Sequence, residues 1–243
     1  MTSTVTTLEY TAGDTLCKGE YYTPNNASGL LPLVLVTHAW DGLNDEVRSK
    51  AAQLADEGYI AFAIDIHGEG KTITDMAELM PTLTPYFQDR AMLLERMQGA
   101  VTAAKTIPGA DLSRIGAMGY CFGGMAVLDL ARAGGDDIKG VVTFHGSLNG
   151  NTLGTTPGTP KSLTTKILVL HGDDDPLVPP EQVAAFKEEM NAKEADWQLY
   201  AYSQTVHAFT RAAANDPGFG AVYNAAADRR SWQAMLNFFQ EVL

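Results

Sequence analysis

The stretch MGYCFGG, residues 118–124, places one of only two cysteines in the chain between closely spaced glycines. Gly119-Tyr-Cys121-Phe-Gly123 follows an apolar run and precedes a helical pattern, which is the context of a nucleophile elbow with cysteine in place of serine. Such a turn holds its central residue in a strained conformation, and glycines two positions away avoid a collision. Short motifs also match by chance, so a buried structural cysteine is the alternative interpretation.

The residues after Cys121 strengthen the first interpretation. The amide of Phe122 would lie at the start of the following helix, where the helix dipole favours a thiolate and an oxyanion alike. Gly124 would let the helix approach the sheet closely. We therefore expect Cys121 to be a nucleophile and the N–H of Phe122 to be a donor in an oxyanion hole.

A nucleophilic thiol needs a base and an acid that orients the base, and both candidates follow later apolar runs. HGDDDPLVPPE follows KILVL and SQTVHAF follows WQLYAY, so the order is nucleophile, acid, histidine, as in α/β-hydrolases. We expect His207 to be the base, and of Asp173, Asp174 and Asp175 we favour Asp175 as the acid. The three aspartates lack the spacing of a calcium loop, so a metal site there is not favoured.

The remaining histidines are interpreted as hydrogen-bonded structural residues. His38 and His171 would lie beneath the site, since each follows an apolar run. His67 and His145 are interpreted in the same way, with contact to substrate as the less favoured alternative.

Apolar runs alternate with helical patterns along most of the chain. The start of the chain resembles a β-hairpin around Gly13-Asp14, and Asn44 is expected to cap a helix that ends near Gly58. One helix is expected from about Pro85 to Ile107, after a turn-rich stretch from Gly70 to Pro85 that is a lid or a long connection. The alternation predicts an α/β fold with a doubly wound, mostly parallel sheet flanked by helices on both faces. Residues 1–243 are expected to form a single domain, with a surface loop at 147–165.

The composition excludes several classes of partner. The chain is 45% apolar, 19% charged and carries a net charge of −12, which repels nucleic acid and anionic membranes. No apolar run approaches the roughly 18 residues of a membrane span, and the opening residues do not resemble a signal peptide. A cytoplasmic location is therefore expected. Cys17 and Cys121 do not resemble a disulfide framework, so we expect both to be free.

Taken together, these motifs resemble the dienelactone hydrolase family of α/β-hydrolases, which use a Cys-His-Asp triad. The similarity runs from LVLVTHAWDG through MGYCFGG and LHGDDDPLVPPEQV to VHAFTRAAAND and DRRSWQAM. It implies Cys121 as nucleophile, His207 as base and Asp175 as acid, with the N–H of Trp40 as the second oxyanion donor. Arg211 matches a position where the family carries an arginine that holds the substrate carboxylate.

The chain departs from the family pattern in the loop after LVLVTHA. Dienelactone enzymes place a glutamate there that contacts the resting thiol, whereas this chain has Ala39, and Asp41 lies two residues further on. We therefore expect Ala39 and Trp40 to border the substrate, and His207 alone to activate Cys121. The expected activity is that of a broad short-chain carboxylesterase rather than a strict dienelactone hydrolase, without a metal or another cofactor.

Two other functions remain open from the sequence. A protein of this fold can bind a small ligand without turnover, because fold does not fix function. A thioesterase or thiol peptidase would share the triad, with amide cleavage the less favoured activity. In each case the partner is a small molecule, neither nucleic acid nor membrane is involved, and the protein is a monomer or a homodimer.

Overall fold

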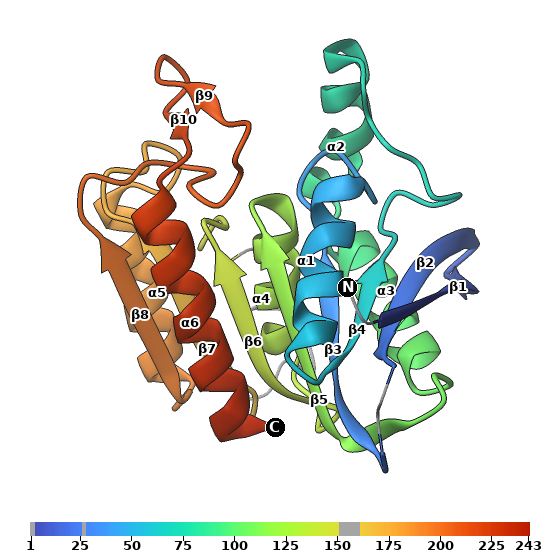
Figure 1. Cartoon of the computed structure of the whole chain (residues 1–243). Helices are drawn as coiled ribbons and strands as arrows, with labels where there is room; N and C mark the ends of the chain where they lie inside the picture. The colour runs from blue at the N-terminus through green and yellow to red at the C-terminus, as the bar shows by residue number, and fades with distance from the viewer. Residues whose placement is uncertain (1–2, 26–27, 151–160) are drawn as a thin grey trace. The chain divides into compact units, whose positions relative to one another are not determined.

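Strands and helices alternate along the chain in the computed structural model, which describes residues 3–25, 28–150 and 161–243 (Figure 1). The chain divides into two compact units, Met1–Ala117 and Met118–Leu243. The boundary falls inside one strand, β5 (Ala110–Tyr120). The expectation of a single domain stays a prediction.

The first unit is built on strands in the order β1-β2-β4-β3-β5. Its other strands are β1 (Ser3–Ala12), β2 (Thr15–Pro24), β3 (Leu31–Thr37) and β4 (Ile60–Ile64). The hairpin of β1 and β2 is confirmed, and Gly13 takes φ 59° at its turn, where a side chain would be strained. β3 and β4 pair in parallel, and both are largely buried, as their unbroken apolar sequences predict.

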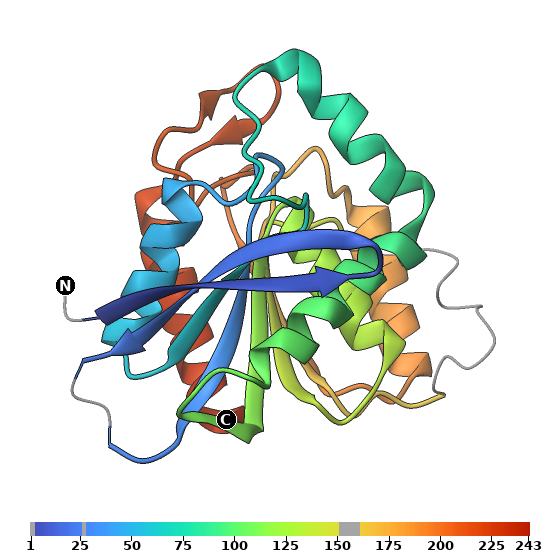
Figure 2. The same ribbon diagram turned by 90° about the vertical axis from the view of Figure 1, so that its right-hand side faces the viewer.

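Helices α1 (Asp45–Asp56) and α3 (Arg90–Ala104) cover opposite faces of these strands, as Figure 2 shows. The predicted cap of α1 is confirmed, because the side chain of Asn44 accepts hydrogen bonds from the amides of Glu46 and Val47. Gly58 follows the helix with φ 97°.

The prediction of one helix from Pro85 to Ile107 is wrong. Helical structure begins earlier, within the stretch from Gly70 to Pro85, with a short 3-10 helix, η1 (Met76–Glu78), and α2 (Leu79–Gln88). After a break at Asp89 the chain forms α3. Asp89 has extended backbone angles, and its side chain accepts hydrogen bonds from the amides of Ala91 and Met92. A capping aspartate therefore begins a new helix inside a stretch whose apolar pattern continues.

The second unit continues with strands in the order β5-β6-β7-β8. Its elements after β5 are α4 (Phe122–Ala133), β6 (Ile138–Phe144), β7 (Lys166–Gly172), α5 (Pro180–Ala192), β8 (Trp197–Tyr202), β9 (Asn215–Asp216), β10 (Ala221–Val222) and α6 (Ala225–Val242). β6 pairs in parallel with β7, and β7 in parallel with β8. Helix α6 covers one face of these strands, and α4 and α5 cover the other (Figures 1 and 2). Parallel pairing and helices on both faces confirm the predicted α/β class.

Several smaller expectations concern single features. Cys17 and Cys121 are free thiols. Of the expected loop at 147–165, the described residues contain neither helix nor strand, and 151–160 lie outside the description. A search of the described residues finds no helix long and apolar enough to span a membrane.

Candidate active site

Cys121 occupies the sharp turn between β5 and α4, with φ 52° and ψ −113°. This is the strained backbone that the glycine pattern predicts for a nucleophile elbow. A Cβ atom on Gly119 would lie 2.2 Å from the carbonyl oxygen of Gly123, and one on Gly124 would lie 2.5 Å from Oγ1 of Thr143. The glycines therefore permit close packing of the turn against itself and against β6.

Two main-chain hydrogen bonds fix the turn. The amide of Cys121 donates to the carbonyl of Phe144 at 3.0 Å, and the carbonyl of Cys121 accepts from the amide of Met125 at 3.1 Å. Phe122 is the first residue of α4, so its amide belongs to the positive end of the helix dipole. This is the helix position that the sequence predicts for an oxyanion donor.

The structure brings Cys121, His207 and Asp175 together. Nε2 of His207 lies 3.1 Å from Sγ of Cys121, and Nδ1 of His207 lies 2.8 Å from Oδ2 of Asp175. The imidazole and the carboxylate are buried, whereas the thiol is partly exposed. The three residues come from three separate connections after β5, β7 and β8, as the sequence predicts.

Asp175 is the buried member of the three consecutive aspartates, while Asp173 and Asp174 are exposed. Its Oδ1 accepts a hydrogen bond from the amide of Leu177 at 2.9 Å, which leaves Oδ2 directed at His207. Among the described residues, no group of three or more His, Cys, Asp and Glu side chains is arranged to hold a metal ion.

The environment of His207 favours its protonated form. Burial lowers the pKa of this imidazole, but the hydrogen bonds with Asp175 and Cys121, together with their charges, outweigh burial and raise the pKa to about 10. An imidazolium at this position is balanced by a carboxylate on one side and a sulfur that can carry negative charge on the other. The geometry therefore suits a thiolate-imidazolium pair.

A small ribbon that the sequence does not predict holds the main chain of His207. After His207 the chain forms β9 and β10 and returns, so that the amide of His207 donates to the carbonyl of Gly220 and its carbonyl accepts from the amide of Val222. Gly220 has φ 79°, and a Cβ atom there would lie 2.3 Å from Cγ of Pro176. The loop of the histidine thus packs on the residue that follows Asp175.

A second histidine contacts the ring of His207. The ring of His145 lies edge to face with it, at 5.0 Å between centroids, and Nε2 of His145 lies 2.8 Å from Oγ1 of Thr210. The expectation that His145 is a hydrogen-bonded residue holds, but the sequence gives no sign that it packs against His207. The backbone of His145 has a positive φ of 40° directly after β6.

Arg211 lies on the turn that follows His207. Its amide donates to the carbonyl of Ala208 and its carbonyl accepts from the amide of Ala214, and the residue is half-buried. Its predicted contact with a substrate carboxylate stays a prediction.

Ala39 and Trp40 belong to the first unit, where two imidazoles hold their carbonyl groups. The amide of Ile66 donates to Nε2 of His38, so Nδ1 of His38 carries the proton and donates to the carbonyl of Ala39 at 2.6 Å. Nε2 of His67 donates to the carbonyl of Trp40 at 2.9 Å. Burial lowers the pKa of His38 to about 4 and that of His67 to about 3, so both are neutral near pH 7. The expectation that His38 and His67 are hydrogen-bonded is confirmed. The roles of Ala39 and Trp40 stay predictions.

Comparison with known proteins gives the same family that the motifs resemble. The sequence matches the profile of the dienelactone hydrolase family over residues 18–243. An uncharacterized protein of Caenorhabditis elegans is 39% identical over 153 residues, which cover 61% of this chain and 93% of that protein. A protein of Escherichia coli K12, provisionally named a carboxymethylenebutenolidase, is 28% identical over 90% of this chain and 80% of its own.

Solved structures agree with the fold. The crystal structure of a dienelactone hydrolase-like promiscuous phosphotriesterase from metagenomic libraries superimposes with a TM-score of 0.93 and 38% sequence identity. The match covers 100% of this chain and 99% of that one. The predicted α/β-hydrolase fold is thereby confirmed.

The first prediction concerns the packing of the elbow. Gly119→Ala is expected to lower the free energy of unfolding by about 1–3 kcal/mol. Its Cβ atom would collide with the backbone of Gly123, and a change of side-chain rotamer cannot relieve a collision with backbone. Urea unfolding measures this loss. Gly218→Ala is the control, since its Cβ atom would lie 3.5 Å from Oδ1 of Asp216, and it is expected to change stability by less than about 0.5 kcal/mol. Equal stability of the two variants would contradict the packing argument.

The second prediction concerns pH and His38. Because the folded state lowers the pKa of His38 to about 4, the unfolded chain binds the proton first as the pH falls, and stability decreases from about pH 6.5 toward pH 4. Because His38 is fully buried, the free energy of unfolding is expected to decrease by about 2–3 kcal/mol over this pH range. His38→Gln is expected to lose that much less than the original chain between about pH 7.5 and pH 4.5 in urea unfolding. Equal losses in both chains would contradict the assignment.

Proposed function

Because the chain belongs to the dienelactone hydrolase family, and is therefore a hydrolase of ester or lactone bonds, we propose that Cys121, His207 and Asp175 are its catalytic triad. The observation that carries this proposal is the position of the His207 imidazole, within hydrogen-bonding distance of both the thiol and the carboxylate. A nucleophile, its base and the group that orients the base are the minimum set for acyl transfer. We further propose a broad short-chain carboxylesterase in a cytoplasmic location.

In the first half of the reaction, the sulfur of Cys121 attacks the carbonyl carbon of the ester. His207 takes the proton of the thiol before attack, so the nucleophile in this mechanism is a thiolate. The carbonyl π electrons move to oxygen, and the resulting oxyanion accepts hydrogen bonds from the N–H groups of Phe122 and Trp40. A single oxyanion donor is worth about 3–4 kcal/mol.

Collapse of the tetrahedral intermediate breaks the bond between carbon and the alkoxide oxygen. Nε2–H of His207 protonates the departing alkoxide, and an acyl-cysteine thioester remains. His207, now neutral, removes a proton from water, and the hydroxide attacks the thioester. Breaking the carbon-sulfur bond releases the acid and restores the thiol, while Asp175 holds the imidazole tautomer throughout.

The substrate assignment depends on residues around the nucleophile. Ala39 supplies no carboxylate at the position where the dienelactone enzymes carry a glutamate, which supports direct activation of Cys121 by His207 and a broader range of esters. Arg211 lies a short distance along the chain from the base and carries the charge that a substrate carboxylate needs. A phosphotriester belongs in the substrate panel, because a similar solved structure is that of a promiscuous phosphotriesterase.

Two alternatives would give different results in the same assays. A ligand-binding protein without turnover would protect Cys121 from iodoacetamide in the presence of ligand but form no product. A thioesterase would hydrolyse a thioester faster than the matching oxygen ester.

The third prediction tests the nucleophile. Cys121→Ala is expected to lower hydrolysis of a short p-nitrophenyl ester by at least about 10³-fold while the fold persists, because no other group replaces the thiolate. Cys17→Ala, which removes the other thiol, is the control and is expected to keep its activity. Mass spectrometry of the original chain mixed with ester is expected to reveal an acyl adduct on Cys121. Full activity of Cys121→Ala would refute the proposed role.

The fourth prediction tests Arg211. Arg211→Gln removes the charge and keeps a hydrogen-bonding side chain, so KM is expected to rise about tenfold for an ester with a free carboxylate. KM for an uncharged ester of similar size is expected to stay the same, because that ester offers no partner for the charge. Steady-state kinetics on the two esters measure this difference. An equal rise for both esters would remove the proposed contact with the carboxylate.

A further inference from the structure

The outer edge of β8 leaves main-chain groups facing away from the sheet. The carbonyls of Asp196 and Tyr202 accept hydrogen bonds from Ile167 and Asp173, on the side of β7. Because strand groups alternate, Leu199 and Ala201 direct their N–H and C=O groups to the opposite side. Among the described residues no strand pairs with β8 on that side.

This edge lacks the features that normally prevent strand pairing. Soluble proteins protect an edge strand with lysine, proline, a bulge or a covering segment. The strand WQLYAY contains no proline and no charged residue, and Tyr200 and Ala201 are exposed. Such an edge is suited to pairing with another strand.

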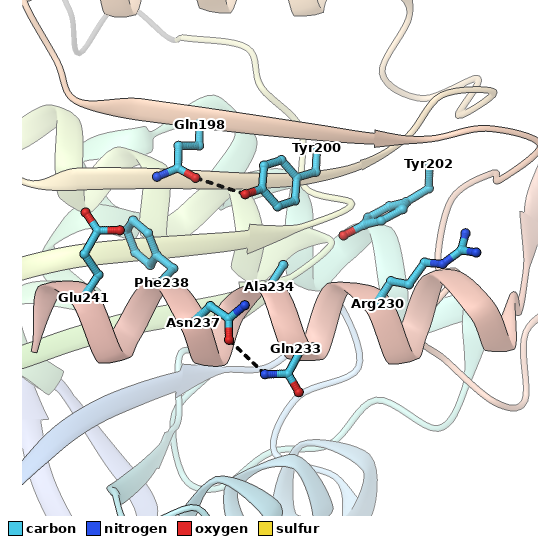
Figure 3. Close-up of a pocket in the computed structure, with 9 residues that line it drawn as sticks. All are labelled: Gln198, Tyr200, Tyr202, Arg230, Gln233, Ala234, Asn237, Phe238 and Glu241. Carbon is cyan, nitrogen blue, oxygen red and sulfur yellow. Dashed lines mark hydrogen bonds between the residues drawn. The ribbon is translucent and has the colours of Figure 1, made fainter.

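A groove of about 410 Å³ lies between this strand and α6 (Figure 3). In Figure 3, Gln198 and Glu241 lie at one end of the groove, and Tyr202 and Arg230 lie at the other. Tyr200 lies between the two ends. The groove therefore carries a negative charge at one end and a positive charge at the other.

We propose that β8 pairs with β8 of a second copy of this chain, antiparallel and across a two-fold axis beside Tyr200. In this register Leu199 of one subunit exchanges main-chain hydrogen bonds with Ala201 of the partner subunit, which uses the outward-facing groups of both strands. Tyr200 lies opposite Tyr200 of the partner subunit. The two chains then share one continuous sheet.

The same register matches the polar groups of the groove. In this register Gln198 of the partner subunit lies opposite Tyr202. The two-fold axis also sets the Arg230 end of one groove beside the Glu241 end of the other. A two-fold interface must be complementary to itself, and this groove meets that requirement, which favours a second copy over an unrelated protein.

The fifth prediction is that the chain is a dimer, with a mass in solution of twice 26.1 kDa by light scattering during gel filtration. Tyr200→Lys is expected to give a monomer, because it places two lysines opposite each other at the axis. Leu112→Lys, at an exposed position on β5, is the control and is expected to stay dimeric. Ester hydrolysis by each variant reports that it is folded. A monomeric original chain, or a folded Tyr200→Lys chain that stays dimeric, would overturn the proposal.

Oxidative cross-linking tests the register. Tyr200→Cys is expected to form a covalent dimer, since directly opposite residues in a non-hydrogen-bonded pair lie close enough for a disulfide. Ala201→Cys is the matched control, because Ala201 faces Leu199 of the partner subunit and is not expected to cross-link. The unsubstituted chain measures the background from Cys121. Equal cross-linking of the two variants would refute this register.

Charge reversal tests the contact between the two grooves. Arg230→Glu is expected to raise the dissociation constant of the dimer at least about tenfold, because the substituted side chain is negative and faces Glu241 of the partner subunit. The two-fold axis repeats this repulsive contact, so it occurs twice in each dimer. Adding Glu241→Arg to the same chain is expected to restore the constant to within about threefold. Glu241 also lies 3.7 Å from Lys166, but this exposed pair contributes little. Failure of the double variant to recover would refute the charge contact.

Discussion

The hydrogen bond between Nδ1 of His207 and Oδ2 of Asp175 is the contact on which the rest of the site depends. It fixes the ring so that Nε2 faces Sγ of Cys121, and together with the contacts to Cys121 it outweighs the burial that would otherwise keep the imidazole neutral. A buried imidazolium without this carboxylate would be costly, because the surroundings offer little water to solvate it. The second unit is accordingly arranged to hold both groups, through Leu177 below the carboxylate and the small ribbon behind the histidine.

The second constraint is the close packing of small residues around the turn of Cys121. Thr143, Gly124 and Gly146 approach so closely that a Cβ atom on either glycine would lie within 2.6 Å of the threonine oxygen. This packing lets the N-terminus of α4 lie directly against the end of β6. The same small residues therefore bring the positive end of the α4 dipole close to the strained backbone of Cys121.

The sequence predicts the parts of this arrangement that depend on local chemistry. Asn44 marks a helix start, unbroken apolar runs mark buried strands, and the elbow glycines mark a strained turn, because each follows from steric or hydrogen-bonding limits of single residues. The break at Asp89 was missed because its capping preference competes with a helical pattern on both sides. Two features depend on partners far along the chain: the ribbon of β9 and β10, and the contact of His145 with His207. Local sequence patterns carry no information about such distant partners, so they could not predict these features.

Strand β8 links the proposed chemistry to the proposed assembly. Its last residue, Tyr202, accepts a hydrogen bond from the amide of Asp173, two residues before Asp175, and the chain beyond it leads to His207. Pairing of the outer edge would restrain the strand from which the loop of His207 departs. A dimer of this kind would therefore act on the order of the loop and leave the chemistry to each chain alone, because the three side chains of the proposed triad come from the same unit.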